Sequence, residues 1–307
     1  MSPDVPDALP AVKVPVILGP TGVGKSRVAF ELAKALDGEI VVCDSRQVYD
    51  RLDIATNKPS PAEMREVRYH LVGIADPASL FTVFDFVQAA GAALTEIAGR
   101  GRLAIVEGGS MLWADALMDG FSLAGVPPRP QRRAELEGLP LEELVALVHR
   151  LDPAARLDER NRPRLVRAIE VLEVAGAPLD RLRRRTPPSW TPIRIGLTAE
   201  LSVIDGRLAE RSRRQVERGV VEETRTALGS GVPEDAPVLT GIGYAEAAGY
   251  LRGEIDPEGL PDVMARSNRR YARRQLRWLR RDPRITWFDA AGDPVPRILE
   301  FLRDRLS

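Results

Sequence analysis

Residues 19–26 read Gly-Pro-Thr-Gly-Val-Gly-Lys-Ser and satisfy the phosphate-loop pattern G-x-x-x-x-G-K-[ST] in full. The glycines of such a loop let backbone N–H groups converge on phosphate oxygens, and the N-terminus of the following helix adds a partial positive charge. The ammonium group of Lys25 can reach a terminal phosphate, and the hydroxyl of Ser26 can bind Mg²⁺. The loop therefore predicts a polyphosphate or diphosphate ligand, and it leaves open whether phosphate is transferred or departs.

Asp44 is a second residue whose position suits chemistry, because it follows directly on the apolar run at residues 39–43. Open α/β sheets place their ligands beyond the carboxyl ends of such strands. The carboxylate of Asp44 could accept a proton from an incoming nucleophile, help to hold Mg²⁺, or simply cap a following helix. Nearby, the amide of Gln47 could pair with the edge of a base such as adenine.

The last long helical segment, residues 261–281, carries its arginines on one side. At 100° per residue they fall within an arc of roughly 140°, and no acidic residue occurs between Met264 and Arg281. This arginine stripe consists of Arg266, Arg269, Arg270, Arg273, Arg274, Arg277, Arg280 and Arg281. A one-sided basic surface of this kind is the footprint expected for binding a nucleic-acid backbone. The whole chain has 44 Lys+Arg and 44 Asp+Glu, so its zero net charge is a cancellation and does not exclude nucleic acid.

Alternating strand-like and helix-like segments would position these residues. Short apolar runs predict strands at residues 12–18, 39–43, 103–106 and 193–197. Helical periodicity predicts helices at residues 25–36, 84–98, 141–149, 164–175, 205–229 and 261–281. Strands that alternate with helices predict an α/β fold, with a P-loop NTPase-like parallel sheet flanked by helices.

The composition changes at residues 122–187, where proline-rich joints separate short helical pieces. We predict a small α-helical insertion domain there, and a catalytic core formed by residues 11–121 and 188–307. Cys43 is the one cysteine in the sequence, which excludes a disulfide framework and a Cys-rich zinc site. The sequence has no apolar run of about 18 residues and no signal-peptide pattern, so we expect a cytoplasmic protein without a membrane partner.

Taken together, these motifs resemble the tRNA dimethylallyltransferase family. Besides the phosphate loop, the resemblance rests on DSRQVY, DIATNKPS, GGS, RLVRAIEV, GIGYAE and RRYARRQLRWLRRDPRITW, which begin at residues 44, 53, 108, 164, 241 and 269. It implies transfer of a dimethylallyl group from dimethylallyl diphosphate to N6 of the adenine just 3′ of a tRNA anticodon. The phosphate loop would hold the diphosphate leaving group with Mg²⁺, and Asp44 would act as the general base on the adenine amine.

The same resemblance implies three sets of site residues. The catalytic residues would be Asp44, Thr21 and Arg207. The diphosphate would be bound by Gly19, Thr21, Gly22, Val23, Gly24, Lys25, Ser26, Arg207 and Arg211, with Ser26 also binding the metal. The tRNA anticodon stem-loop would be contacted by Asp44, Ser45, Arg46, Gln47, Ser110, Arg133, Pro163, Arg164, Arg167, Gly243, Tyr244, Arg273, Arg274, Gln275, Arg277 and Arg280. In this chain Ser110, Trp113 and Pro163 stand where the family has threonine, tyrosine and glutamine.

Three other functions fit some of these residues. A related adenylate isopentenyltransferase would act on free nucleotide, and the Thr-Asn-Lys at residues 56–58 is reminiscent of that branch. A small-molecule P-loop kinase would need an acid for Mg²⁺, a part that Glu107 could play. A non-enzymatic RNA-binding ATPase would leave Asp44 and Gln47 unexplained. We favour the tRNA-modifying prenyltransferase, because the arginine stripe is hard to explain without a polyanion, and we expect it to be a monomer.

Overall fold

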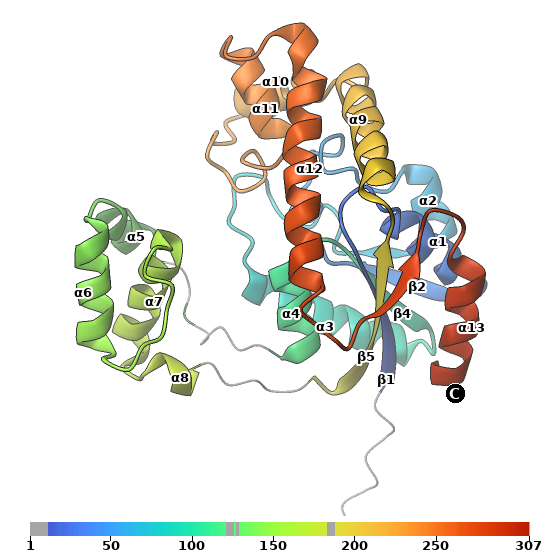
Figure 1. Cartoon of the computed structure of the whole chain (residues 1–307), viewed down its shortest axis with the longest axis horizontal. Helices are drawn as coiled ribbons and strands as arrows, with labels where there is room; N and C mark the ends of the chain where they lie inside the picture. Colours follow the sequence, from blue (N-terminus) through green and yellow to red (C-terminus); the bar gives the residue numbers. More distant parts are fainter. Residues whose placement is uncertain (1–11, 121–125, 127–128, 183–187, 307) are drawn as a thin grey trace, which may run out of the picture. The chain divides into compact units, whose positions relative to one another are not determined.

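The computed structural model describes residues 12–120, 126, 129–182 and 188–306, which form two compact units (Figure 1). The first unit consists of the chain up to Ala114 and from Ser189 onward, and the second is Asp115–Pro188. The first unit contains the sheet, the phosphate loop and the arginine stripe. Within the described ranges, no helix is both long enough and apolar enough to cross a membrane.

A six-stranded sheet forms the centre of the first unit. Its strands are β1 (Val12–Leu18), β2 (Gly38–Val42), β3 (Tyr69–His70), β4 (Leu103–Glu107), β5 (Trp190–Thr198) and β6 (Thr286–Asp289). They lie in the order β3-β2-β4-β1-β5-β6, and every pair of neighbours is parallel. This confirms the predicted α/β fold with a parallel sheet. Because β1 lies between β4 and β5, the phosphate loop that follows it emerges from the middle of the sheet.

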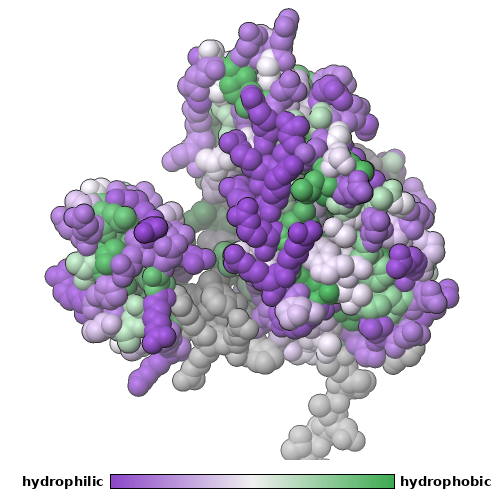
Figure 2. Space-filling model, viewed as in Figure 1, coloured by the Kyte–Doolittle hydropathy of each residue, from purple (hydrophilic) through white to green (hydrophobic). Residues whose placement is uncertain are grey.

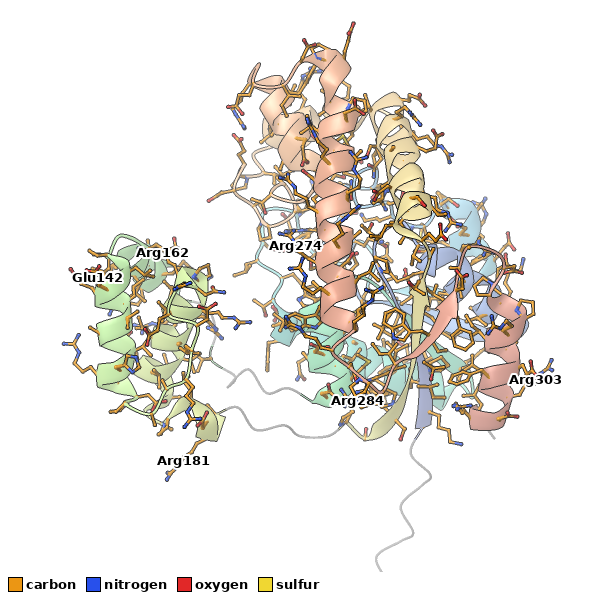
Figure 3. All side chains as sticks on the ribbon, viewed as in Figure 1. Glu142, Arg162, Arg181, Arg274, Arg284 and Arg303 are labelled. Carbon is orange, nitrogen blue, oxygen red and sulfur yellow. The ribbon has the colours of Figure 1, made fainter. Side chains whose placement is uncertain are left out.

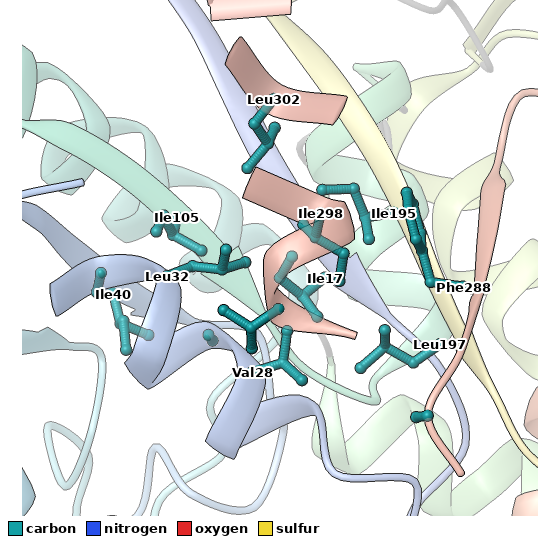
Figure 4. Packing of buried hydrophobic residues seen from close by; sticks show 14 of the residues in the cluster. Ile17, Val28, Leu32, Ile40, Ile105, Ile195, Leu197, Phe288, Ile298 and Leu302 are labelled. Atoms are coloured by element: carbon teal, nitrogen blue, oxygen red, sulfur yellow. The ribbon is translucent and has the colours of Figure 1, made fainter. Parts of the chain in front are cut away.

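Helices α1 (Lys25–Ala35) and α13 (Val295–Leu306) share one hydrophobic core with the strands (Figure 4). Its members include Val28, Leu32, Ile298 and Leu302 from the helices and Ile17, Ile40, Ile105, Ile195 and Leu197 from the strands. Helix α3 (Val83–Gly99) packs on β2 and β4 with its own buried residues, Phe86, Ala90, Leu94 and Ile97. All five residues of β2 are buried, as expected for a strand that is covered on both faces.

Four helices follow β5, and the arginine stripe runs along the last of them. They are α9 (Leu201–Glu217), α10 (Val220–Gly229), α11 (Tyr244–Leu251) and α12 (Leu260–Leu279). The predicted single helix over residues 205–229 was wrong, because the helix is interrupted at Gly219 and a second helix begins after it. That glycine has a φ of 92°, in the left-handed region, and forms the N-cap of α10. The predicted helix at residues 261–281 is confirmed as α12, which packs beside α9 (Figure 1).

The second unit is helical within its described residues. After the end of α4 (Met111–Asp119) come α5 (Pro130–Glu137), α6 (Leu141–Leu151), α7 (Arg162–Ala175) and α8 (Leu179–Leu182). These helices enclose a hydrophobic core of their own, which includes Leu136, Leu144, Leu165 and Ile169. The side chain of Asn161 caps α7 by accepting a hydrogen bond from the N–H of Arg164 at 3.2 Å.

Candidate active site

Three loops meet at the carboxyl edge of the sheet, because β2, β4 and β1 are parallel neighbours. β1 leads into the phosphate loop, β2 leads into Asp44, and β4 ends at Glu107. The loops after β2 and β4 touch directly, since the N–H of Ser45 donates to Ser110 Oγ at 2.8 Å. The fold thus brings together the phosphate loop, Asp44 and the Gly-Gly-Ser segment, which lie in separate parts of the sequence.

The phosphate loop requires glycine at two of its positions. Gly22 has a φ of 82° and Gly24 a φ of 103°, and a Cβ on Gly22 would lie 2.8 Å from Leu208 Cδ2. Helix α1 begins immediately afterwards, at Lys25, so its free N–H groups and its positive dipole end face the loop. The Nζ of Lys25 donates to the carbonyl oxygen of Pro20 at 3.1 Å, which holds the ammonium group against the loop.

Lys25 shares its surroundings with two carboxylates. Burial lowers the pKa of Lys25, and the negative charges of Glu107 and Asp44 act against that effect. Burial raises the pKa of Asp44 and of Glu107, and the positive charge of Lys25 opposes the rise in both. The three charges therefore interact within one site, where a bound phosphate would meet the ammonium group at the N-terminus of a helix.

Ser26 and Glu107 form the part of the site that fits a magnesium ion. Ser26 Oγ donates to Glu107 Oε1 at 3.2 Å, so a hydroxyl and a carboxylate meet beside the phosphate loop. Magnesium is usually bound through one or two protein oxygens together with substrate phosphates and water. The described residues contain no group of three or more His, Cys, Asp or Glu that could hold a metal. A metal here would therefore take most of its ligands from phosphate and water.

The carboxylate of Asp44 is held by the backbone of its own loop. Its Oδ1 accepts the N–H of Arg46 at 2.8 Å and that of Gln47 at 3.4 Å. These two bonds orient the group and oppose the rise in the pKa of Asp44 that burial causes. The interpretation of Asp44 as a helix cap was wrong, because residues 45–48 form a turn and no helix begins there; Oδ1 closes that turn instead. Since both backbone bonds end on Oδ1, Oδ2 is the oxygen that a substrate could meet.

Gln47 contributes an acceptor that the protein leaves unused. The residue is 7% exposed, and within the described part of the chain its Oε1 accepts no hydrogen bond. An unpaired buried amide oxygen costs about 1–3 kcal/mol, so a ligand donor at this position would be favoured. In the loop after β4, Ser110 Oγ accepts the N–H of Ser45 at 2.8 Å and donates to the Ser45 hydroxyl at 3.1 Å.

The two arginines of α9 differ in what they contact. The guanidinium of Arg207 donates to the carbonyl oxygens of Val23 and Ala290, at 3.1 and 3.2 Å, and so fastens the phosphate loop. Arg211 donates one bond, to Asn268 Oδ1 at 2.8 Å, and its buried Nε has no partner among the described residues. Burial lowers the pKa of Arg211 to about 10, and the charge of Asp44 opposes this. Arg211 is thus the arginine whose charge interacts with the site.

Gly243 and Tyr244 are engaged inside the first unit. Tyr244 is 1% exposed, and its hydroxyl donates to Glu223 Oε2 at 2.5 Å and accepts the N–H of Ala55 at 3.3 Å. A Cβ on Gly243 would lie 2.6 Å from Ala55 Cβ. These contacts fix the loop that follows Asp53. The sequence predicted only tRNA contacts for Gly243 and Tyr244 and did not predict this structural role.

The arginine stripe follows α12, where hydrophilic side chains form a continuous band on the face shown in Figure 2. Between α9 and α12 this band borders a groove of about 570 Å³ lined by Asp205, Val263, Arg266, Arg269, Arg270 and Arg273. Arg273 is bound to Asp205 by two hydrogen bonds, of 3.0 and 2.8 Å. Arg274, Arg277 and Arg280 are exposed, and Arg274 projects from α12 (Figure 3) with its guanidinium 5.6 Å from the Tyr271 ring.

Tyr271 lies beside the site, although the sequence predicted no role for it there. Its hydroxyl donates to the carbonyl oxygen of Gly109 at 3.1 Å. Burial raises the pKa of Tyr271 to about 12, and the negative charge of Asp44 acts in the same direction. The available signal was its spacing, because Tyr271 lies four residues before Gln275 and hence on the same helix face. Gln275 itself is 1% exposed.

Four of the expected tRNA contacts belong to the second unit. Arg133 and Arg167 both approach the fully buried carboxylate of Glu170, at 2.6 and 3.6 Å. Arg167 also donates to the carbonyl oxygen of Val126 at 2.6 Å. Pro163 and Arg164 lie in the first turn of α7 and are both exposed. Arg133 and Arg167 therefore have a defined internal partner.

Comparisons with known proteins agree on one family. The family described as IPP transferase matches residues 47–282. A tRNA dimethylallyltransferase from Thermomicrobium roseum is 39% identical over 300 residues, which cover 96% of this chain and 90% of the relative. A crystal structure of the tRNA isopentenylpyrophosphate transferase from Bacillus halodurans is 34% identical, with a TM-score of 0.73 and 96% of each chain covered. A eukaryotic dimethylallyltransferase acting on tRNA shares the fold, with 22% identity, a TM-score of 0.82, and coverage of 96% of this chain and 80% of the other.

Proposed function

This chain belongs to the IPP transferase family, and from that premise we propose that it is a tRNA dimethylallyltransferase. It transfers the dimethylallyl group of dimethylallyl diphosphate to N6 of the adenine just 3′ of a tRNA anticodon. The observation that carries the chemistry is the convergence of Asp44, Lys25 and Glu107 at the edge of the sheet. There the charge of Lys25 opposes the rise that burial causes in the pKa of both carboxyl groups, and the two carboxylates oppose the fall in the pKa of Lys25.

The diphosphate is bound by the phosphate loop, residues 19–26. Loop N–H groups and the ammonium group of Lys25 contact its oxygens, and Arg211 supplies a second positive charge. Arg207 acts through the loop, by holding the carbonyl of Val23. Ser26 and Glu107 would hold Mg²⁺, which when bound neutralises part of the negative charge on the leaving diphosphate.

The reaction exchanges a carbon–oxygen bond for a carbon–nitrogen bond and moves one proton. The C1–O bond of dimethylallyl diphosphate breaks, and the departing diphosphate keeps the electron pair. The N6 lone pair of adenine forms the new N–C bond to C1, and the proton that N6 then loses passes to Asp44 Oδ2. Because the exocyclic amine is a weak nucleophile, a carboxylate placed to take this proton assists the attack.

The adenine must leave its base stack to reach Asp44. Gln47, with its unpaired Oε1, accepts a hydrogen bond from the base, and Ser45, Arg46 and Ser110 line the same loops. The exposed members of the arginine stripe bind backbone phosphates of the anticodon stem-loop. The helical insertion, with Arg133, Pro163, Arg164 and Arg167, supplies further tRNA contacts. We expect the enzyme to act as a monomer in the cytoplasm, where tRNA is found.

The test is to incubate the protein with labelled dimethylallyl diphosphate and either tRNA or AMP, and to locate the labelled adenine. Label on the tRNA adenine next to the anticodon supports the proposal. Label on AMP alone would instead identify an adenylate isopentenyltransferase. Phosphate transfer from ATP to an acceptor, without prenylation, would identify a kinase and reject both prenyltransferase functions.

A further inference from the structure

Gln275 joins helix α12 to two of the three loops of the site. Its Oε1 accepts the N–H of Thr21, in the phosphate loop, at 2.7 Å. Its Nε2 donates to the carbonyl oxygen of Gly109, after β4, at 2.8 Å. Tyr271, one turn earlier on α12, donates to the same Gly109 oxygen at 3.1 Å. A single amide side chain thus bridges the phosphate loop and the loop after β4.

The fit around this bridge is tight. A Cβ on Gly109 would lie 2.6 Å from Gln275 Nε2, so the position needs a glycine for the amide to approach. The third loop is attached through the neighbour of Gly109, because Ser110 Oγ accepts the N–H of Ser45, and Ser45 follows Asp44. Gln275 is therefore part of a series of hydrogen bonds that connects the phosphate loop to the loop that bears Asp44.

The position of Gln275 also excludes a direct contact between its amide and RNA. Both polar atoms of its side chain are bonded to backbone, and the residue is 1% exposed. No surface of the amide is left for a base or a phosphate of RNA. In addition, the N–H of Thr21 is used by Gln275, so the phosphate loop does not offer that group to the diphosphate.

We propose that Gln275 is a positioning residue that sets the phosphate loop against the loops bearing Asp44 and Ser110, and that it does not contact tRNA. This inference rests on the proposed transfer reaction. Without the amide, the peptide units of Thr21 and Gly109 lose their partners and can reorient. The phosphate loop is then less well preorganised for the diphosphate, whereas the arginine stripe on the exposed side of α12 is unchanged.

The first test compares Gln275→Met, which has similar volume and lacks both hydrogen bonds, with the wild-type enzyme. We expect the KM for dimethylallyl diphosphate and the inhibition constant of pyrophosphate to rise about tenfold, as for the loss of roughly 1.4 kcal/mol. The Kd for an anticodon stem-loop RNA should stay within about twofold. A raised Kd for RNA with an unchanged KM for dimethylallyl diphosphate would overturn the inference and restore Gln275 as an RNA contact.

A matched control separates positioning from a general loss of stability. Gln215 on α9 is 3% exposed and likewise donates to backbone, at the carbonyl oxygens of Ile54 and Ala55, 3.1 and 3.2 Å away. Gln215→Met should leave pyrophosphate binding unchanged. If Gln215→Met weakens pyrophosphate binding as much as Gln275→Met does, the effect is one of stability and the inference fails.

Gln275→Glu gives a second readout that also holds if the methionine variant does not fold. A protonated glutamic acid can accept from Thr21 and donate to Gly109, whereas its anion would face the Gly109 oxygen without a proton. Burial favours the protonated form, so the ratio of variant to wild-type inhibition constants for pyrophosphate should fall towards one as the pH is lowered. A ratio that does not change with pH would contradict the bridge.

These binding measurements keep the two proposals distinguishable. Pyrophosphate binding needs no turnover, so it reports on Gln275 even if no RNA is prenylated. Failure of the wild-type enzyme to prenylate tRNA would reject the proposed function, and wild-type pyrophosphate affinity in both Gln275 variants would reject this inference alone.

Discussion

Ser26 Oγ, in the first turn of α1, donates a hydrogen bond of 3.2 Å to Glu107 Oε1, on the last residue of β4. The two residues are 81 positions apart in the chain and meet because β1 and β4 are neighbours in the sheet. The pair gives the site one hydroxyl and one carboxylate beside the phosphate loop.

Loss of either oxygen of this pair should weaken the use of Mg²⁺. In Ser26→Ala and Glu107→Gln the Mg²⁺ concentration needed for half-maximal transfer should rise about tenfold, because one ligand or its charge is lost. Titration of activity with MgCl₂ after chelation measures this. Full activity of the wild-type enzyme in excess EDTA would contradict a metal at this position.

Asp44→Asn should abolish most of the transfer and leave RNA binding intact. The amide keeps the size of the side chain and can keep its backbone bonds, but it cannot take the proton from N6. We expect kcat to fall by a factor of about 10²–10⁴, with the Kd for the anticodon stem-loop within about twofold. A turnover close to that of the wild-type enzyme would show that Asp44 is not the base.

The value of kcat/KM should fall at both low and high pH, because two groups of the site have shifted pKa values. Asp44 must be ionised to accept a proton, and burial raises its pKa above the ordinary 3.8, so activity should fall at a higher pH than for an exposed aspartate. Lys25 must be protonated, and burial lowers its pKa below 10.5, so the alkaline loss should come earlier. A profile that is flat down to about pH 4 would disagree with the direction for Asp44.

Arg274 and Arg277 should account for part of the salt dependence of RNA binding. Each is exposed on α12, and changing both to Gln removes two phosphate contacts. The slope of log K against log salt should become shallower by roughly 1.5. Arg303→Gln, on α13 and away from the stripe (Figure 3), is the control. An unchanged slope in the double variant would exclude these arginines as phosphate contacts.

Glu170→Ala should loosen the second unit selectively. The buried carboxylate accepts the N–H of Arg129 at 3.0 Å and bonds Arg133 at 2.6 Å, so its loss leaves several donors without a partner. We expect a cost of about 2 kcal/mol, seen as faster amide hydrogen exchange in α5 and α7. Glu173→Ala, at a half-buried pair with Arg132, should cost less than about 1 kcal/mol. Equal exchange in both variants would contradict the central place of Glu170.

Much of the framework could be predicted from local patterns. The phosphate-loop spacing, the strand at Val12–Leu18 and the arginine stripe are properties of contiguous segments. They were readable because glycine freedom, apolar runs and a period of 3.6 residues act over short stretches. The same reasoning missed β3 and β6, which have two and four residues, because strands so short show no period. It also carried one helix through Gly219, where apolar spacing continued across a left-handed glycine.

What only the tertiary structure decided is the pairing of side chains from distant segments. The sequence by itself determined that a phosphate loop, a carboxylate after a strand and a basic helix exist in this chain. It did not determine that Gln275 bridges Thr21 and Gly109, or that Arg273 forms an ion pair with Asp205. Nor did it determine that the charge of Arg211 interacts with Asp44, whereas Arg207 holds the phosphate loop. Such contacts depend on strand order and helix packing, which bring residues within about 3 Å whatever their separation along the chain. Local sequence propensities therefore do not predict these contacts.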